Sequence, residues 1–520
     1  MVFKILLLLV FFAVTIFVGL YFRKRAASVN DFVLGGRSVG PWLSAFSYGA
    51  TYFSAVVFVG FAGQFGWRFG TAAVWIGLGN AFIGALSAWF VLGRRTRLMT
   101  NHLKSATMPE FFGKRYRSTA IKLCAAVIIF VFLIPYTASL YNGLSRLFSM
   151  AFEVDFAICI IVMAALTAIF VVAGGYIATA VNDFIQGTVM LVGIVAIIAA
   201  VLISNGGFTA AMTALAQVEG PGFAPGIYTS FFGPEIANLI GVIILTSLGA
   251  WGLPQMVARF YSIKSEKMIP KGALVSTVFA LVIAGGCYFL GSFGRLYAGD
   301  IALKPDGTPI YDSIVPTMLS QFSDVMIGVV ILMVFAASIS TLSSLVMSSA
   351  STLTLDFLKG HVIKKMTDGL QLLIIRVLIV VFVVVSSVIA IVQYKNGFSF
   401  IANLMGVSWG AIAGSFLAPF LYGLYWKRVT KASVLACFIF CIVLMTWNVL
   451  ISLNVLPATS LPSLIRHPIN AGAFAMIAGL VIVPVVSWLT RRPEKQYVES
   501  CFSCYEEMVT VKVSRDLGTN

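Results

Sequence analysis

Apolar runs long enough to cross a lipid bilayer recur from one end of this 520-residue chain to the other. A membrane-spanning helix needs about 20 mostly apolar residues, and only helices and closed barrels satisfy their backbone hydrogen bonds inside lipid. With 60% hydrophobic and 10% charged residues, the chain has no long polar stretch that could form a separate soluble domain. The sequence therefore predicts an all-α polytopic membrane protein of about thirteen helices, beginning near residues 2, 43, 71, 120, 156, 182, 236, 273, 319, 370, 397, 431 and 469.

The basic residues predict how the helices are oriented. If the N-terminus is outside, all but seven of the 35 Lys and Arg residues fall on the inner side. Cytoplasmic loops of membrane proteins carry such an excess of positive charge, so we expect an N-out, C-in topology. The net charge of +16 then reflects topology, not a nucleic-acid-binding surface. The first apolar run, 5–22, lacks a small-residue cleavage site and precedes a basic cluster, so we interpret it as a retained span.

Two of the predicted spans are interrupted at matching positions. The second contains Gly49-Ala50-Thr51-Tyr52-Phe53-Ser54, and the seventh contains Thr246-Ser247-Leu248-Gly249-Ala250-Trp251-Gly252-Leu253-Pro254. The second span could be a tight helix crossing through small residues, or a broken helix, which is tolerated at membrane depth only inside protein or beside a cavity. In the seventh, two Gly and a Pro within nine residues favour a broken helix. Paired breaks favour an inverted-repeat transporter with its site near the membrane midplane.

The paired breaks also predict the domain organisation. Each break would open a half of five helices, and the two halves would have opposite orientations. We expect a single transporter domain over 1–492, with an extra first helix 2–22, repeat one 43–204, repeat two 236–425, extra helices 431–490 and a cytoplasmic tail 493–520.

Hydroxyl side chains crowd one apolar stretch, 336–357. On a helix, Ala337, Ser340, Thr341 and Ser344 lie along one stripe, because positions three and four apart are neighbours. Hydroxyls in membrane helices often bond to their own backbone or pack as small residues. Alternatively, neutral oxygens on adjacent turns replace the water around a sodium ion. The stripe alone leaves both interpretations open.

Asp183 is the acidic residue that most calls for an explanation, because a carboxylate at the edge of the hydrocarbon normally has a partner. It could instead cap the helix that we expect to begin near residue 182. An enzyme is excluded on different grounds. The three histidines all fall in predicted loops, and no His-Glu cluster lies at membrane depth.

Five motifs, taken in order and with their spacing, resemble the sodium:solute symporter family over roughly residues 5 to 490. They are Asp31-Phe-Val-Leu-Gly-Gly-Arg-Ser-Val-Gly40, Gly174-Gly175 followed by Asn182-Asp183-Phe-Ile-Gln186, Pro254 with Ala258-Arg259-Phe260, Ser340-Thr341-Leu342-Ser343-Ser344, and Gly423-Leu-Tyr-Trp-Lys-Arg428. The proline and pantothenate branches are the most similar. The resemblance implies a leucine-transporter-type 5+5 inverted repeat with one extra helix before the core and two after it. It also implies sodium-driven uptake by alternating access.

The resemblance also implies two sodium sites. The first would use the backbone carbonyls of Ala50, Phe53 and Ala337 and the hydroxyls of Ser340 and Thr341. Neutral oxygens suit a monovalent cation, whereas a divalent ion would normally recruit carboxylates. The second site, further toward the inside, would consist of Asp183, Ser340, Ser343 and Ser344.

The solute is expected to bind near the two breaks, against a wall of Tyr52, Ser54, Tyr136, Thr246, Ala250 and Trp251. Because the chain departs from proline-type members at Tyr52, Thr246 and Ala250, we expect a small organic carboxylate or amino acid, with a sugar or sialic acid as the alternative. A sodium channel or a transporter-like sensor is the competing class. We expect a functional monomer in a bacterial plasma membrane, with the lipid bilayer and no nucleic acid as its surroundings.

Overall fold

The computed structural model describes residues 2–22, 28–220, 222–304, 307–359, 361–395 and 401–506. Across these residues the chain forms helices and isolated β-bridges, with no strand, as the sequence predicts. Ten helices are long and apolar enough to cross a membrane, and the bent pair α11 (Ile236–Gly252) and α12 (Pro254–Tyr261) makes an eleventh. The expected number of thirteen membrane crossings remains a prediction. It counts as separate crossings some segments that the structure joins into one long, bent helix.

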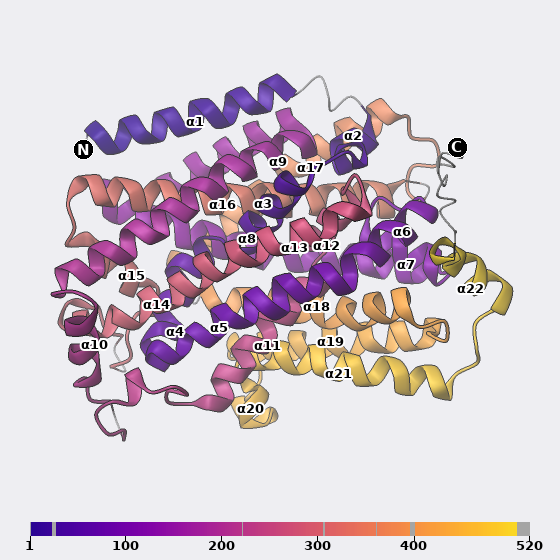
Figure 1. Ribbon diagram of the computed structural model, residues 1–520. Helices are drawn as coiled ribbons and strands as arrows, with labels where there is room; N and C mark the ends of the chain where they lie inside the picture. The colour runs from indigo at the N-terminus through magenta and orange to yellow at the C-terminus, as the bar shows by residue number, and fades with distance from the viewer. Residues whose placement is uncertain are drawn as a thin grey trace, which may run out of the picture.

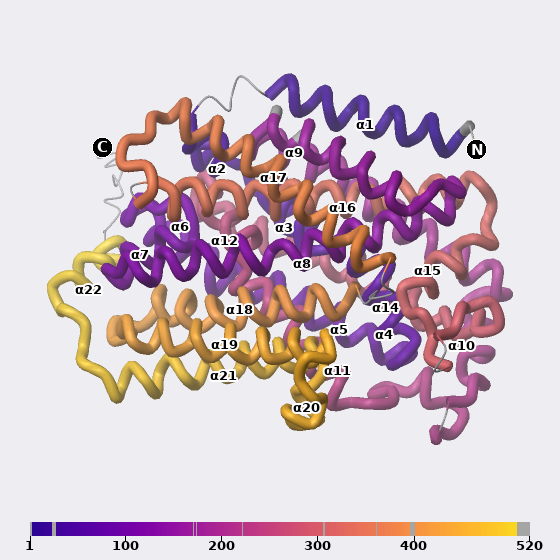
Figure 2. Tube along the Cα trace, turned by 180° about the vertical axis from the view of Figure 1, so that it is seen from behind, coloured from indigo at the N-terminus to yellow at the C-terminus, as the bar shows by residue number. Residues whose placement is uncertain are grey.

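The long helices lie side by side, and α1 begins at one end of the bundle while α22 (Lys495–Phe502) lies at the other (Figure 1). Helix α1 (Val2–Phe22) forms one flank and packs on α9 (Phe156–Ser204). On the opposite flank, α18 (Ile401–Tyr425) packs on α21 (Pro468–Leu489), and both contact α19 (Lys431–Ser452). The view from behind shows the same two flanks enclosing the remaining helices (Figure 2).

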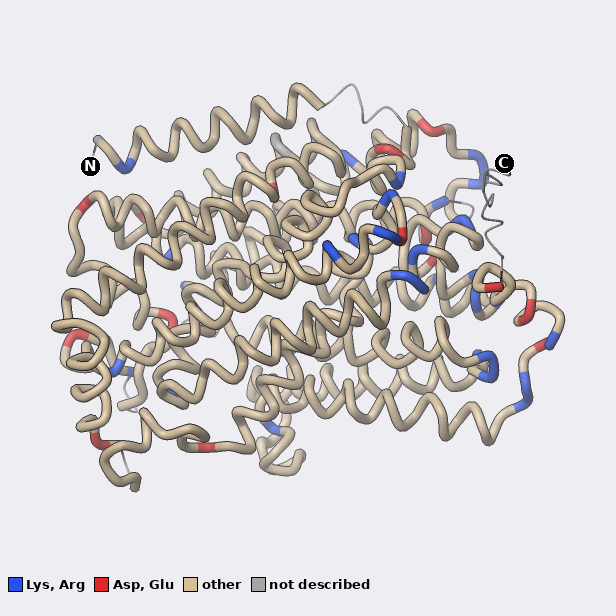
Figure 3. The backbone as a smooth tube through the Cα atoms, in the orientation of Figure 1, with Lys and Arg blue, Asp and Glu red and all other residues tan. Residues whose placement is uncertain are grey.

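Lysine and arginine positions gather at the end of the bundle where α22 (Lys495–Phe502) lies (Figure 3). The N-terminal end carries few of them. Charge separated in this way along the helix axes is what a membrane protein with that end in the cytoplasm would show. The direction of insertion itself stays a prediction.

Both predicted interruptions are breaks in helices. Helix α3 (Pro41–Tyr52) ends at Phe53, whose backbone is extended, with φ −111° and ψ 121°. The chain resumes as a π-helical segment (Val56–Phe61) and α4 (Ala62–Phe69). The second break is at Leu253, with φ −83° and ψ 125°, and there α11 and α12 meet at 46°. The alternative of a tight, unbroken helix in the second predicted span is therefore wrong.

A glycine turn divides α9 into two parts. Gly175 has φ 62° and ψ −168°, a conformation that a residue with a Cβ rarely adopts. The residue that caps the start of α9 is Asp155, whose carboxylate accepts from the N–H groups of Ala157 and Ile158. Asp183 lies two turns beyond the glycine, inside the second part. The interpretation of Asp183 as a helix cap is therefore wrong.

The hydroxyl-rich stretch forms the inner part of α16 (Asp324–Thr352), the helix that brings the two breaks into contact with α9. Helix α16 packs against α9, α3 and α8 (Thr119–Phe152), and it also contacts α12. Its residues 333–347 are all buried. Hydroxyls in this stretch therefore face other helices instead of lipid or water.

Part of the expected tail packs on the bundle. Residues 495–502 form α22 (Lys495–Phe502), in which Cys501 is buried. The Tyr497 hydroxyl donates to the carbonyl of Lys114, and a ring nitrogen of His102 lies 2.8 Å from the carbonyl of Ser500. The rest of the tail, 507–520, lies outside the described residues.

Candidate functional site

Thr341 joins α16 to the end of α3 at the first break. Its hydroxyl lies 3.1 Å from the carbonyl oxygen of Ala337, 3.4 Å from that of Ala50 and 3.2 Å from that of Thr51. All four residues are buried. The hydroxyl has no such hydrogen bond to Phe53, which lies at the break itself and whose N–H donates to Gly49 at 3.2 Å. Three carbonyls around one hydroxyl form a cluster of neutral oxygens.

Asp183 is fully buried and lies on α9, which packs against both helices of this oxygen cluster, α3 and α16. Its Oδ1 accepts from the Ser340 hydroxyl at 2.6 Å, and its Oδ2 accepts from the Ser47 hydroxyl. The structure therefore pairs Asp183 with Ser340, as the sequence predicts for a second site. It also turns the Ser340 hydroxyl toward Asp183, so that Ser340 connects the two predicted sites.

The guanidinium of Arg259 also lies against Asp183. Its Nη2 is 3.4 Å from Asp183 Oδ2, and it donates to the Thr51 hydroxyl at 2.7 Å and to the Ser344 hydroxyl. Only 2% of the Arg259 surface is exposed. Ser344 thus belongs to the Asp183 cluster, but through Arg259. Ser343 does not, because its hydroxyl bonds to the carbonyls of Ile339 and Ser340 on its own helix, at 2.8 and 2.9 Å.

Three residues of this cluster were not among the predicted ligands: Ser47, Thr51 and Arg259. Ser47 lies three residues before Ala50 and four before Thr51, so its side chain is on the same face of α3 as both. That spacing was a usable signal. Arg259 was part of a resembling motif, but nothing in the local sequence indicates that its side chain reaches α9 and α16.

The aromatic members of the predicted solute wall meet around Trp409 of α18. The Tyr52 ring stacks on Trp409 with centroids 6.3 Å apart, and the Tyr136 ring meets Trp409 edge-on at 5.9 Å. The Tyr52 hydroxyl donates to the carbonyl of Thr246 at 2.6 Å, which ties the first break to the second. Trp251 donates from its indole to the carbonyl of Ile83 at 2.9 Å. Trp409 was not predicted.

The three smaller members of the wall are also buried at the breaks. The Thr246 hydroxyl bonds to its own helix, at the carbonyl of Val242, 2.8 Å away. Ser54 accepts from the N–H of Val56 at 3.3 Å, at the start of the outer half of the first broken helix. Ala250 adds no polar atom. Contacts therefore link Tyr52 to Thr246 and, through Trp409, to Tyr136, and all six predicted residues are buried and carry no charge.

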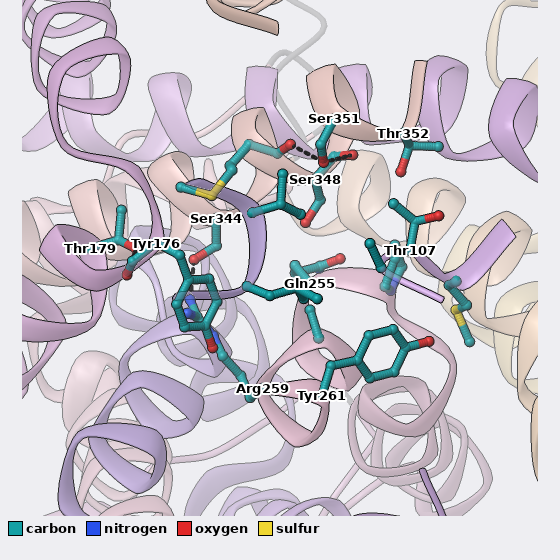
Figure 4. A pocket seen from close by; sticks show the side chains of 17 residues that line it. Thr107, Tyr176, Thr179, Gln255, Arg259, Tyr261, Ser344, Ser348, Ser351 and Thr352 are labelled. Atoms are coloured by element: carbon teal, nitrogen blue, oxygen red, sulfur yellow. Dashed lines mark hydrogen bonds between the residues drawn. The ribbon is translucent and has the colours of Figure 1, made fainter. Parts of the chain in front are cut away.

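A cavity of about 40 Å³ lies beside the Asp183–Arg259 cluster, toward the end of the bundle where α22 lies. Figure 4 shows Arg259 reaching past the Tyr176 ring toward Ser344, with Gln255 and Ser348 beside them. The guanidinium carbon lies 5.1 Å from the centroid of the Tyr176 ring. Arg259 therefore forms the wall between the cavity and Asp183.

The model of the sodium:solute symporter family matches residues 32–440, most of the chain. The protein belongs to the sodium:solute symporter family. It is therefore a multi-pass membrane protein that couples sodium to the movement of a small solute.

Two curated relatives are similar to this symporter over almost their whole length. The osmoregulated proline transporter OpuE of Bacillus subtilis (strain 168) is 28% identical over 489 residues, which cover 94% of either chain. The sodium/proline symporter of Staphylococcus aureus (strain JH9) is 29% identical over 522 residues, covering 98% of this chain and 96% of that one. A solved sodium-coupled sialic acid symporter has the same fold, with a TM-score of 0.74 at 18% identity over 94% of this chain and 98% of that one.

At the opposite end of the symporter, a buried ion pair joins a short helix to α8. Asp312 of α15 (Tyr311–Ser320) is 2% exposed, and its Oδ2 lies 4.0 Å from Nε of Arg146. Burial raises the pKa of the Asp312 carboxyl to about 6, although Arg146, Lys304 and a hydrogen bond from the backbone at Ile401 act in the opposite direction. Because α15 also packs on α4, the pair links α8 to the outer half of the first broken helix.

The ion pair predicts a pH effect on stability. An unfolded aspartate has a pKa of about 3.9, so Asp312 takes up its proton more readily in the folded protein. Lowering the pH from 7 to 5 should therefore stabilise the wild type relative to Asp312→Asn by about 1 kcal/mol. Thermal unfolding of both proteins in detergent across this range measures the difference. The stability of the wild type minus that of Asp312→Asn should rise as the pH falls. A value that stays constant or decreases would contradict the prediction.

Proposed function

We propose that this symporter imports a small amino acid or organic carboxylate together with sodium, by alternating access across a bacterial plasma membrane. One observation carries the proposal: side-chain contacts join the two breaks, the hydroxyl cluster of α16 and the uncharged aromatic wall to one another. The Tyr52 hydroxyl connects the breaks directly through the carbonyl of Thr246, 2.6 Å away. A solute bound here would contact both halves of the proposed inverted repeat.

The chemistry of the wall favours a compact solute with a carboxylate. The helix that follows the first break begins at Ser54, whose carbonyl accepts from Val57 and Phe58 at 2.9 and 3.1 Å. The N-terminus of a helix attracts anions, through its free N–H groups and its dipole. The rings of Tyr52, Tyr136 and Trp409 would cover an apolar body. The two relatives named as proline transporters also support an amino acid, so proline is the first solute to test.

For the first sodium ion we propose the oxygen cluster between α3 and α16, with Ala50, Phe53, Ala337, Ser340 and Thr341 as ligands and Thr51 as an addition. Carbonyl and hydroxyl oxygens are hard, neutral donors that can replace the water around a monovalent cation. An ion held by both helices would bind most tightly in the conformation that keeps them together. By linkage, sodium and solute then raise each other's affinity by the same factor.

For a second sodium ion we propose Asp183, Ser340, Ser343 and Ser344, with Ser47 as an addition. The contacts of Asp183 with Ser340 and Ser47 support this site. In the described conformation Ser343 bonds to its own helix, so it would have to rotate to reach the ion. The carboxylate supplies the charge that the first site lacks.

The proposed orientation is N-out and C-in, with thirteen crossings and a single chain as the functional unit. The small cavity beside Arg259 lies toward the end that carries most of the lysines and arginines. With that end in the cytoplasm, the cavity would be the start of the inner pathway.

Thermal stabilisation of the purified protein tests this function. Proline, other small amino acids, carboxylates, a hexose and sialic acid would each be added in sodium and in potassium. A ligand of the native state raises apparent stability by about 2.7 kcal/mol at a hundred times its dissociation constant. We expect proline or a similar amino acid to stabilise the protein in sodium and not in potassium.

Each other outcome changes a different part of the proposal. A hexose or sialic acid that acts alone would replace the solute class. Equal stabilisation in both salts would remove the proposed sodium sites. Sodium flux through proteoliposomes without any solute would favour a channel over a symporter.

A further inference from the structure

Arg259 lies where a cation bound to Asp183 would lie. Its Nη2 touches oxygens from three helices: Thr51 of α3 at 2.7 Å, Asp183 of α9 at 3.4 Å and Ser344 of α16. Asp183 and Ser344 are two of the proposed second-sodium ligands. The side chain comes from a fourth element, α12, the inner half of the second broken helix.

A sodium ion and this guanidinium would exclude each other. Both would use the carboxylate of Asp183 and the hydroxyl of Ser344, and Ser344 Oγ is only 3.1 Å from Thr51 Oγ1. Two positive charges held this close together repel each other strongly away from bulk water. The described conformation is therefore one in which the protein supplies its own cation at this place.

Arg259 also has somewhere to withdraw. It forms part of the wall of the inner cavity, beside Tyr176 and Gln255 (Figure 4). Its Nε has no hydrogen-bond partner within the described part of the chain, although it is buried. Helix α12 is short, eight residues, and the break at Leu253 separates it from α11. A small movement of α12 toward the cavity would take the guanidinium off Asp183.

We propose that Arg259 is a tethered cation that takes the place of the second sodium ion at Asp183 after that ion has left, and so allows the empty carrier to return. The proposal rests on the second sodium site proposed above. Leaving a buried carboxylate without a partner carries a large free-energy cost. An empty carrier with a bare Asp183 would meet that cost, and Arg259 removes it without using an ion from solution.

The competing interpretation is a structural ion pair that only holds α12 against α9 and α16. The two differ in which transport mode they affect. Net uptake requires the empty carrier to return. Exchange, with sodium and solute on both sides of the membrane, does not. A tethered cation is needed for the first mode, and a structural pair is needed equally for both.

The first test is transport by Arg259→Gln in proteoliposomes, with radiolabelled proline as the probe. We expect net uptake, driven by sodium into solute-free vesicles, to fall at least ten times more than exchange. Arg259→Lys keeps the positive charge and should retain more net uptake than Arg259→Gln. A parallel loss of both modes in the two variants would overturn the proposal in favour of the structural pair.

The second test needs no solute. Thermal stabilisation by sodium alone, against a choline background, should occur at a sodium concentration at least fivefold lower in Arg259→Gln, because the competing cation is gone. An unchanged or higher sodium concentration would overturn the proposal. If Arg259→Gln is not recovered in folded form, the same measurement on Arg259→Lys decides: its shorter, less well-matched donor should also lower the sodium concentration.

Asp183→Asn separates this proposal from the site on which it rests. If the second sodium site is correct, this variant should couple one sodium ion per solute instead of two. An unaltered stoichiometry would remove the second site and the tethered cation with it. A reduced stoichiometry, together with equal losses of exchange and net uptake in the Arg259 variants, would keep the site and remove only the role of Arg259.

Discussion

Replacing Thr341 by alanine should raise the sodium concentration for half-maximal uptake at least fivefold. The Thr341 hydroxyl is the side-chain group that bridges α16 to the carbonyls of Ala50 and Thr51 at the end of α3. Removing it takes away one proposed ligand of the first sodium ion and leaves two buried carbonyls with one partner fewer. A lost ligand of this kind costs about 1–3 kcal/mol, which corresponds to about 5- to 150-fold in affinity.

The measurement is initial uptake against sodium concentration in proteoliposomes, with the protein content matched. Thr341→Ser keeps the hydroxyl and should stay close to the wild type. Ser338→Ala is a control on the same helix: the Ser338 hydroxyl is equally buried, but it bonds to the carbonyl of Val334 on its own helix at 2.6 Å. Unchanged sodium dependence in both Thr341→Ala and Ser340→Ala would remove the proposed first site.

Gly291→Ala should prevent the outer half of the first broken helix from packing. Gly291 ends α14 (Gly286–Ser292), and a Cβ there would lie 1.9 Å from the carbonyl oxygen of Ala62 on α4. Across the same contact, a Cβ on Gly66 would lie 2.1 Å from the carbonyl carbon of Gly291. These clashes are with backbone, so no side-chain rotation can relieve them. We expect a loss of about 2–3 kcal/mol or more of stability and little folded protein.

Gly285→Ala is the matched control, because it lies on the same transmembrane segment and a Cβ there would meet nothing within 4 Å. Size-exclusion profiles and thermal unfolding of the two detergent-solubilised variants provide the comparison. A Gly291→Ala protein with the yield and melting temperature of Gly285→Ala would show that α4 and α14 do not need this close contact. The pair would then have to lie further apart than the structure places it.

Alternating access gives the broken helices their functional meaning. In the described structure, α3 is tied to α16 by Thr341, to α12 by Arg259 and to α9 through the Ser47–Asp183 bond. At the other end, α15 links α4 to α8 through Asp312 and Arg146. At the proposed second site, a sodium ion would replace the protein groups that contact Asp183. The Asp312–Arg146 pair responds to pH instead. Sodium ions and protons would therefore act at opposite ends of the first broken helix, α3 and α4.

The predicted sites differ in how much of each could be found without the fold. Asp183 and Ser340 were paired by a resemblance, and their side chains do meet. Nearness to the breaks predicted the wall residues, of which Tyr52 contacts Thr246 and Tyr52 and Tyr136 both contact Trp409. The resemblance that paired Asp183 with Ser340 also implied Ser343, which bonds along its own helix. Periodicity places a hydroxyl on a face, but the packing of the neighbouring helix determines whether that hydroxyl bonds outward or back.

The helices and their breaks could be predicted from the sequence, because they depend on residues that are close together in the chain. Hydrophobic runs predict helices because lipid leaves no other partner for the backbone. Small and polar residues at 49–54, and two glycines with a proline at 246–254, predict the breaks. Gly174-Gly175 favours the turn that divides α9. Only the tertiary structure decided which side chains share the charge of Asp183. Arg259 is 76 positions away from Asp183 in the chain. In the same way, Trp409 contacts Tyr52 and Tyr136 although it is far in sequence from both breaks. Which of many distant groups meets a buried carboxylate depends on how the helices pack, and no local pattern encodes it.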